Sequence, residues 1–328
     1  MYSLVNNMVL SVCILIRLPH LWLAQTGCAW ARIHSTMRSY LGRFAPSPTG
    51  LLHQGSLVAA LACALDALVH QGRWLLRIED IDKPREQPGA ATRIIQTLRT
   101  LGFEWHGEIV YQSQHQARYQ AALERLSPML YPCICSRKQI AERQPRRTAD
   151  GENIYPGTCA TGNTTRTAEM LKNPAWRLQL PERVISFTDR WAGLLQENLA
   201  RECGDIVLKR ADGLWAYHLA VVVDDIDAGV THIVRGADLQ HSTPRQLFLY
   251  ECLKATAPIY MHVPLVTHET GQKLSKQNLA PAVKLDQGLS ELQQAASHLG
   301  LRLQTDSLTQ FWRAAPLAWE QRLRRLPS

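Results

Sequence analysis

A strand, a helix and a second strand in direct succession constrain the fold of this chain more than any other feature. Residues 39–46 (SYLGRFAP) predict a short strand, and residues 56–72 (SLVAALACALDALVHQG) predict an amphipathic helix closed by Gly72. Residues 73–82 (RWLLRIEDID) predict the second strand. Strands joined by a helix of this length run parallel, because the crossover returns the chain to the same edge of the sheet. The sequence therefore predicts an α/β fold with a parallel sheet.

The loop between the first strand and the helix, residues 42–56 (GRFAPSPTGLLHQGS), suits a ligand site. In an open parallel sheet, ligands bind beyond the carboxyl ends of the strands, where a helix N-terminus offers free N–H groups to phosphate. The prolines stiffen the loop, and Gly50 and Gly55 allow a sharp turn or close approach of a ligand. His53 falls where the helix begins and can donate to a phosphate oxygen. Taken alone, the loop fits an ordinary turn equally well, with a structural or exposed histidine.

The rest of the chain alternates between helix and strand around one segment of different character. Residues 90–105 and 115–130 predict two helices, whereas the segment from residue 131 to about 190 is polar and holds clustered cysteines. We interpret that segment as an insertion. Alternation over residues 205–236 predicts the return of the main sheet, followed by a helix with Thr243 as N-cap and Pro244 at its first position.

The N-terminal residues 1–36 carry no recognisable targeting pattern. They hold two basic residues and no acidic one, with a short apolar run from Met8 to Ile16. A signal peptide needs a charged region before such a run, and a membrane-spanning helix needs about 20 apolar residues. Because the first predicted strand follows Met37 at once, we expect translation to start there and residues 1–36 to be a spurious extension.

Charge and cysteine content narrow the class of partner. A net charge of +8 favours a polyanion such as RNA, DNA or a nucleotide. Eight cysteines are too few for a disulfide scaffold in 328 residues, and Cys133, Cys135 and Cys159 crowd into one segment, which predicts a metal site in a reducing compartment. Tetrahedral zinc needs a fourth ligand, for which the Tyr155 phenol, a carboxylate such as Glu152, or water are the candidates.

Four stretches together resemble one enzyme family. They are RFAPSPTGLLHQGS at 43–56, LLRIEDID at 75–82, YHLAVVVDDIDAGVTHIVRGADLQHSTPRQ at 217–246 and KLSKQ at 273–277. In this order they are similar to the signatures of class I aminoacyl-tRNA synthetases of the glutamyl type. The chain differs from those signatures at three positions, with Ser56 for the second histidine of the first motif, Leu274 for methionine and Gln277 for the last serine.

The resemblance implies a Rossmann-type class I synthetase catalytic domain with a parallel sheet, a zinc-containing insertion and a short helical C-terminal region. It implies ATP as a substrate with Mg²⁺, and catalysis by positioning and charge neutralisation rather than by a general base. The implied catalytic residues are His53, Lys273 and Lys276, although a basic GQKLSK turn alone would more often be a solvated loop. The implied ATP contacts are Pro46, His53, Gly55, Ser56 and Lys276. The implied division is 1–36 as extension, 37–130 and 191–280 as the two catalytic halves, 131–190 as insertion and 281–328 as the C-terminal region.

Glutamate carries two carboxylates and one ammonium, so its pocket needs two cations and one anion. Arg43 and Arg235 lie at predicted strand ends, and guanidinium groups bind carboxylates through two parallel hydrogen bonds. Glu79 is the matching partner for the ammonium. The alternative is that these arginines form structural ion pairs with nearby acids, which are Asp80, Asp82, Asp224 and Asp225. By resemblance, the glutamate contacts are Arg43, Phe44, Ala45, Pro46, Ser47, Glu79, Tyr217 and Arg235.

The same resemblance favours Tyr155 as the fourth ligand of one structural Zn²⁺, beside Cys133, Cys135 and Cys159. The adjacent basic run, residues 137–147 (RKQIAERQPRR), then either follows an RNA backbone or forms a solvated loop.

The chain has 52 residues after Lys276, too few for the helical anticodon-binding region of a complete glutamyl enzyme. The resemblance therefore implies a truncated, cytoplasmic paralogue, working as a monomer without a membrane partner. Such a paralogue activates L-glutamate without tRNA and esterifies it to the queuosine base in the anticodon loop of tRNA(Asp). Two alternatives stay open, a tRNA-charging enzyme that lacks its anticodon domain and a catalytically inactive RNA-binding protein.

Overall fold

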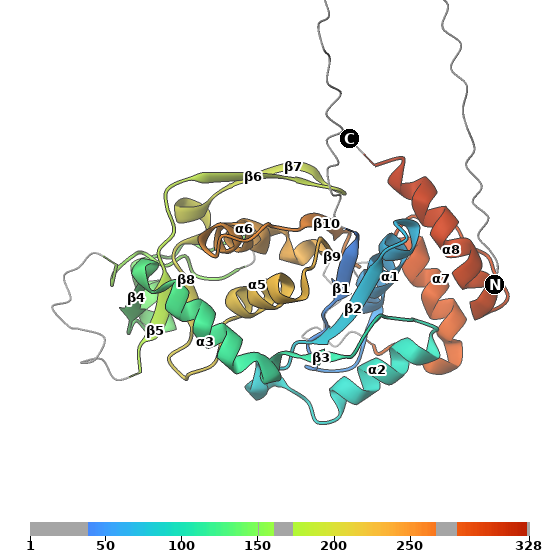
Figure 1. Ribbon diagram of the computed structural model, residues 1–328, viewed down its shortest axis with the longest axis horizontal. Coiled ribbons are helices and arrows are strands. Elements are labelled where there is room, and N and C mark those ends of the chain that lie inside the picture. Colours follow the sequence, from blue (N-terminus) through green and yellow to red (C-terminus); the bar gives the residue numbers. More distant parts are fainter. Residues whose placement is uncertain (1–38, 150, 161–172, 267–280, 327–328) are drawn as a thin grey trace, which may run out of the picture. The chain divides into compact units, whose positions relative to one another are not determined.

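The computed structural model describes residues 39–149, 151–160, 173–266 and 281–326 (Figure 1). The strands are Leu41–Phe44 (β1), Arg73–Ile78 (β2), Val110–Tyr111 (β3), Leu130–Cys133 (β4), Ala175–Leu178 (β5), Val184–Asp189 (β6), Gly193–Asn198 (β7), Ile206–Lys209 (β8), His232–Gly236 (β9) and Ile259–Val263 (β10). The α-helices are Gln54–Val69 (α1), Ala90–Thr100 (α2), Gln116–Arg125 (α3), Arg137–Arg143 (α4), Tyr217–Ala228 (α5), Thr243–Cys252 (α6), Gly288–His298 (α7) and Leu308–Leu323 (α8).

The parallel strands predicted from residues 39–82 are present and belong to a larger parallel arrangement. Strand β2 pairs with both β1 and β3, and β9 pairs with β10, in each case parallel. Strands β1 and β9 meet through Thr231, whose N–H donates to the Leu41 carbonyl at 2.9 Å and whose Oγ1 accepts from Leu41 N at 2.8 Å. The spatial order is therefore β3, β2, β1, β9, β10. The direction of winding reverses between β1 and β9, which is where an open α/β sheet forms its ligand crevice.

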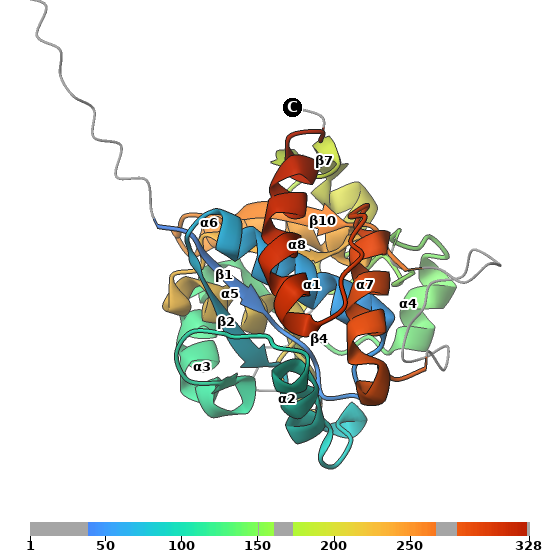
Figure 2. The same cartoon turned by 90° about the vertical axis from the view of Figure 1, so that its right-hand side faces the viewer.

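Helix α1 is the centre of the main hydrophobic core and is held there by a buried carboxylate. Its apolar residues pack against the sheet on one side and against α7 and α8 on the other (Figure 2). Asp66, fully buried in this helix, accepts from Tyr40 Oη at 2.7 Å, from Trp319 Nε1 at 3.3 Å and from both Nη atoms of Arg190 at 2.6 and 2.9 Å. Because Arg190 directly follows β6, this ion pair ties the end of β6 to the core.

The segment after β3 builds antiparallel structure. Strand β5 lies between β4 and β8 in one sheet, and β6 and β7 form a hairpin in full register from Val184 opposite Asn198 to Asp189 opposite Gly193. The prediction that residues 205–236 return to the main sheet is correct for β9 and wrong for β8, which pairs antiparallel with β5. Alternating hydrophobicity indicates a strand but does not specify its partner.

The start of α6 also differs from the prediction. Ser242, not Thr243, precedes the helix, and neither side chain makes a capping hydrogen bond within it. The Thr243 hydroxyl instead accepts from Arg235 Nη2 at 2.9 Å and lies 3.2 Å from His262 Nε2. A buried tertiary partner has replaced the local cap. Within the described part of the chain, none of the helices has the length and apolar character needed to cross a bilayer.

Candidate active site

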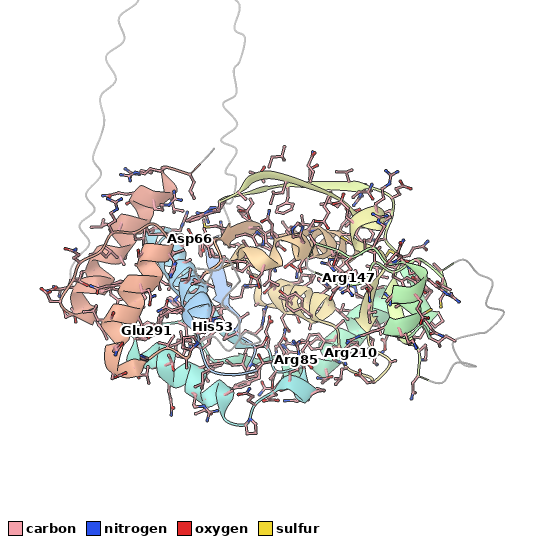
Figure 3. All side chains as sticks on the ribbon, turned by 180° about the vertical axis from the view of Figure 1, so that it is seen from behind. His53, Asp66, Arg85, Arg147, Arg210 and Glu291 are labelled. Carbon is pink, nitrogen blue, oxygen red and sulfur yellow. The ribbon has the colours of Figure 1, made fainter. Side chains whose placement is uncertain are left out.

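The loop after β1 leads into α1 through His53, as predicted. His53 is the N-cap residue of α1, and its Nδ1 accepts from the Ser56 N–H at 3.4 Å while its Nε2 lies 3.1 Å from Ser56 Oγ. Gly50 has a φ of 151°, a conformation that favours glycine in the turn before the helix. Figure 3 shows His53 at the N-terminal end of α1 and Asp66 toward its other end. The partly buried His53 therefore stands where a helix N-terminus can receive an anion.

The four residues after Arg43 bring the loop alongside β2. Phe44 and Pro46 are buried, whereas Ala45 and Ser47 are partly exposed. The carbonyl of Pro46 accepts from the Glu79 N–H at 3.0 Å. This bond holds the loop beside the residue that follows β2, so the predicted glutamate contacts of the two strands lie together.

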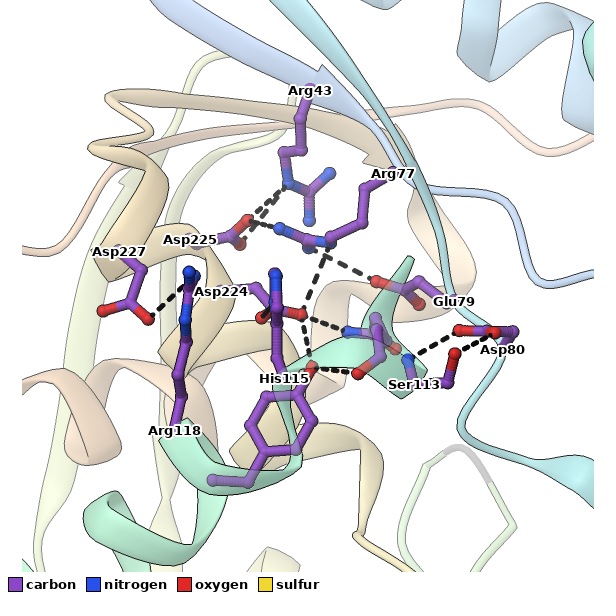
Figure 4. Close-up of polar contacts among 12 residues, drawn as sticks. Arg43, Arg77, Glu79, Asp80, Ser113, His115, Arg118, Asp224, Asp225 and Asp227 are labelled. Atoms are coloured by element: carbon purple, nitrogen blue, oxygen red, sulfur yellow. Dashed lines mark hydrogen bonds and ion pairs between the residues drawn. The ribbon is translucent and has the colours of Figure 1, made fainter. Parts of the chain in front are cut away.

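Arg43 is held by a buried chain of charges (Figure 4). Its Nε donates to Asp225 at 3.2 and 3.4 Å, and Asp225 also accepts from Arg77 Nη1 at 2.6 Å. Arg77 reaches in turn to Glu79, with its Nη2 3.3 Å from Glu79 Oε1. All four side chains are at most 8% exposed. Two guanidinium groups and two carboxylates thus form one alternating, buried network.

The network shows that Arg43 does form one of the structural ion pairs considered as an alternative, but with only one edge of its guanidinium group. Arg43 does pair with Asp225, but through its Nε edge, and no described residue is recorded as a hydrogen-bond partner of its Nη atoms. The other nearby acids have partners other than Arg43: Asp80 pairs with Ser113 and Lys83, Asp82 with Arg85, and Asp224 with Gln112, His115, Tyr119 and, at 3.9 Å, Arg77. Arg43 therefore combines a structural edge with an edge that can meet a ligand.

The pKa values of the two carboxylates in the network shift in opposite directions. Burial by itself raises the pKa of Asp225, but Arg43 and Arg77 lower it further than burial raises it. For Glu79 burial prevails, and its pKa lies above the ordinary value despite the attraction of Arg77 and Arg43. Glu79 is thus a buried carboxylate that shares its cation, Arg77, with Asp225, and a substrate ammonium beside it would add positive charge.

Arg235, at the end of β9, is held by neutral groups. Its Nε donates to His262 Nε2 at 3.0 Å, and its Nη2 donates to Thr243 Oγ1 at 2.9 Å and to the Leu239 carbonyl at 3.2 Å. Its Nη1 lies 3.4 Å from Tyr217 Oη, which joins the two predicted contacts. Arg235 is 4% exposed, so its charge is buried without a carboxylate among these partners.

Sequence reasoning named Asp225 as a possible partner of the arginines but missed Arg77, His262 and Asp189. Arg77 lies within the quoted LLRIE stretch, where a charged residue in an apolar strand is a usable signal. His262 is likewise a histidine within the otherwise hydrophobic strand β10, and Asp189 ends β6. The predicted catalytic Lys273 and Lys276 lie outside the described residues.

The three clustered cysteines do meet in the antiparallel region. The Sγ atoms of Cys133, Cys135 and Cys159 lie within 4.8 Å of one another. Tyr155 Oη lies 3.4 Å from Cys133 Sγ and 3.7 Å from Cys135 Sγ, and it accepts from the Cys159 N–H at 2.8 Å. Tetrahedral zinc with bonds of about 2.3 Å to sulfur and about 2.0 Å to oxygen needs ligand separations of roughly 3.5–3.8 Å. The three thiols and the phenol fit that ion.

The surroundings of the cluster distinguish the candidate fourth ligands. Glu152 turns toward α6, with its Oε2 3.2 Å from Arg245 Nη1, and is not part of the cluster. Arg177 stacks over the Tyr155 ring at 3.8 Å and is fixed by its Nη1 donating to the Asp205 carbonyl at 2.7 Å. A buried cation at this distance favours anionic ligands. The geometry thus favours the phenol over the carboxylate.

The comparison with known families agrees with the four motifs. The family described as tRNA synthetases class I (E and Q), catalytic domain, matches residues 41–298. The chain belongs to this family. The predicted resemblance to class I synthetases of the glutamyl type is therefore confirmed, together with the parallel α/β fold and the assignment as an enzyme of the ligase class.

The chain is also similar to individual proteins of this family. The chain is 52% identical over 293 residues to the glutamyl-Q tRNA(Asp) synthetase of Janthinobacterium sp. (strain Marseille), covering 86% of this chain and 97% of the relative. It is 51% identical over 289 residues to the protein of the same name from Verminephrobacter eiseniae (strain EF01-2), covering 86% and 98%. The structure of the glutamate–tRNA synthetase from Elizabethkingia anophelis matches with a TM-score of 0.63 and 28% identity. That match covers 73% of this chain but only 53% of the longer enzyme.

Proposed function

We propose that this class I synthetase activates L-glutamate with ATP and Mg²⁺, without RNA, and transfers the glutamyl group to the queuosine base in the anticodon loop of tRNA(Asp). The observation that carries the proposal is the pair of buried guanidinium groups, Arg43 and Arg235, placed with Glu79 around the reversal between β1 and β9. The names of relatives that match over nearly their whole length support the choice of acceptor.

The pocket has the charges that glutamate requires. The Nη atoms of Arg43 are not used in its bonds to Asp225, and among the described residues Nη1 of Arg235 makes only the long contact to Tyr217, so these two edges suit the two carboxylates. Glu79, whose pKa is raised by burial, suits the ammonium. Tyr217 adds a hydroxyl beside Arg235.

Activation joins two bound substrates and needs little covalent help from the protein. A carboxylate oxygen of glutamate attacks the α-phosphorus of ATP, the bond from that phosphorus to the oxygen bridging to the β-phosphate breaks, and pyrophosphate leaves. Mg²⁺ bound with ATP would supply positive charge for the phosphates. The N-terminus of α1 and His53 would stabilise the phosphate charge that develops. In the second step a hydroxyl of the modified base attacks the glutamyl carbonyl and forms an ester bond. The bond between the carbonyl carbon and the phosphate oxygen breaks, AMP leaves with its electron pair, and the hydroxyl proton is released.

The cysteine cluster would serve the RNA step indirectly. Zn²⁺ bound by Cys133, Cys135, Tyr155 and Cys159 would pin the chain between β4 and residue 159, which has only a small apolar core of its own. The exposed basic run that starts at α4 adjoins this site and supplies positive charge for an RNA backbone.

Glutamate-dependent exchange of pyrophosphate into ATP, measured without RNA, tests activation. We expect exchange with glutamate and at least a hundredfold less with aspartate or glutamine. Transfer is then tested with labelled glutamate and tRNA(Asp) with and without queuosine. Label on the modified base supports the proposal, whereas label on the terminal adenosine would make the chain a tRNA-charging enzyme. No exchange in a folded protein would favour the RNA-binding alternative.

A further inference from the structure

We infer that Asp189 and His262 are positioning residues for Arg235, and that together they orient its Nη1 edge toward the carboxylate of the amino-acid substrate. The inference rests on the proposed function of the pocket and adds two residues that no motif contains. The three side chains come from β6, β10 and β9 and form one continuous buried line. His262 and Asp189 are each 1% exposed, and Arg235 is 4% exposed.

The hydrogen bonds assign one tautomer to His262. Its Nδ1 lies 2.7 Å from Asp189 Oδ2, and a carboxylate can only accept, so Nδ1 carries the proton. Arg235 Nε can only donate, so His262 Nε2, 3.0 Å away, must be the lone pair that accepts. Burial lowers the pKa of His262 and keeps the ring neutral, although Asp189 acts in the opposite direction. The carboxylate thus makes the histidine an acceptor for the arginine.

The same accounting leaves one edge of Arg235 for a ligand. A guanidinium has five N–H donors. Nε donates to His262, and the two on Nη2 donate to Thr243 Oγ1 and the Leu239 carbonyl. Only Nη1 remains, with a long contact of 3.4 Å to Tyr217 Oη. The three hydrogen bonds from Nε and Nη2 fix the plane of the guanidinium group and therefore determine where its Nη1 edge points.

Asp189 is itself fixed from several directions. Its Oδ1 accepts the backbone N–H groups of Trp191, Ala192 and His262 at 3.0, 2.9 and 3.2 Å. The next residue, Arg190, forms the ion pair with Asp66 in α1, and its N–H donates to the Tyr260 carbonyl at 2.9 Å. The end of the β6–β7 hairpin is thereby joined to both α1 and β10, so the position of Arg235 depends on a turn far from the substrate loop.

The isosteric variant Asp189→Asn gives the sharpest test. The amide keeps an oxygen for the three backbone donors but turns an N–H toward His262 Nδ1, which moves the ring proton to Nε2 and against Arg235 Nε. We expect the KM for glutamate in pyrophosphate exchange to rise at least tenfold, with the KM for ATP changed less than twofold. His262→Asn has an amide too short to place an acceptor at the Nε2 position, so it should raise the KM for glutamate in the same way. His262→Gln, which reaches the Nε2 position, should recover most of the affinity.

Surface variants of matched chemistry, Asp306→Asn and His298→Asn, should leave both KM values unchanged, since both residues are exposed. If Arg235→Gln raises the KM for glutamate while Asp189→Asn and His262→Asn do not, the positioning role is wrong and the proposed function stands. If Arg235→Gln has no effect, the proposed pocket is wrong. Nitrogen-15 NMR of labelled histidine tests the tautomer without activity: a protonated Nε2 in the native protein would overturn the inference.

Discussion

The proposed amino-acid pocket and the cysteine cluster are built in opposite ways. The four side chains of the cluster come from residues 133–159, a single short segment. The pocket and its supports come from residues as distant as Arg43 and His262, with the Arg43 to Asp225 bond alone spanning 182 positions. The difference teaches that the cluster depends on local spacing, whereas the proposed amino-acid site depends on the whole parallel sheet and on buried charges that compensate one another.

The largest expected effect breaks the charge network of the pocket. Asp225→Ala leaves Arg43 and Arg77 buried beside each other with too little negative charge, so we expect the free energy of unfolding to fall by about 3–5 kcal/mol. Urea denaturation measures it. The control is Glu320→Ala, which removes an exposed partner of Arg324 and should cost less than about 1 kcal/mol. Equal costs would show that the network contributes no more than a surface pair.

The next prediction concerns binding rather than folding in the same region. Glu79→Gln keeps the shape of the side chain but removes the charge proposed for the ammonium, so kcat/KM for glutamate should fall about 10- to 100-fold. Pyrophosphate exchange at varied glutamate and ATP concentrations measures the change. Glu104→Gln, at an exposed position, is the matched control. An unchanged kcat/KM would place the ammonium elsewhere.

Variants of the cysteine cluster should lose zinc affinity, in contrast to variants of the charge network, which should lose folding stability or substrate affinity. Protein prepared without chelators should hold close to one zinc per chain, and Tyr155→Phe should weaken zinc binding by roughly tenfold or more in competition with a chelator. Glu152→Gln should leave zinc affinity unchanged, because Glu152 pairs with Arg245 outside the cluster. If Glu152→Gln weakened zinc binding and Tyr155→Phe did not, the fourth ligand would be the Glu152 carboxylate and not the Tyr155 phenol. Activation of glutamate should survive Tyr155→Phe if the two regions are separable.

A smaller effect separates activation from transfer. The double variant Arg146→Ala with Arg147→Ala changes two exposed side chains whose described bonds go only to the carbonyls of Arg201 and Gly151. We expect RNA-independent exchange to remain intact, and transfer to queuosine-containing tRNA to weaken a few-fold, with a salt slope lower by about 0.7 for each lost phosphate contact. Arg302→Ala with Arg325→Ala, in the C-terminal helical region, is the control of equal charge. Loss of exchange would mean that the basic run belongs to the pocket.

The smallest expected effect is the contribution of His232, in strand β9, to the pH dependence of folding stability. His232, stacked on Tyr40 at 4.1 Å, has its pKa lowered from 6.5 to about 4 by burial and then by Arg190. The unfolded chain therefore binds the extra proton first, and stability should decline as the pH falls from about 6.5 to about 4. His232→Phe keeps the stacking and should reduce that decline by roughly 1 kcal/mol or less, since the ring is partly exposed. Melting temperatures at pH 7.5 and pH 5 measure it, and an identical decline in both proteins would exclude His232 as a source.

Much of the fold could be predicted from the sequence, because it depends on the local pattern of residues. The strand, helix and strand of residues 39–82, the position of His53 at the start of α1 and the grouping of the three cysteines all depend on residues close in sequence. The partner of β8 was not readable, because alternation leaves the neighbouring strand unspecified. Thr243 was assigned to a helix cap for the same reason: propensity describes a residue by its neighbours in the chain and not by the arginine that the fold brings to it.

The sequence by itself determined the class of fold and the family, and its motifs supplied both arginines, the glutamate and the tyrosine of the proposed pocket. Only the tertiary structure decided how those side chains are held. It gave Arg43 an anionic support in Asp225 and Arg235 a neutral support in His262, which Asp189 makes an acceptor. The physical reason is that a buried charge needs partners at hydrogen-bond distance, and these partners lie on other strands and helices, where sequence spacing carries no information about distance.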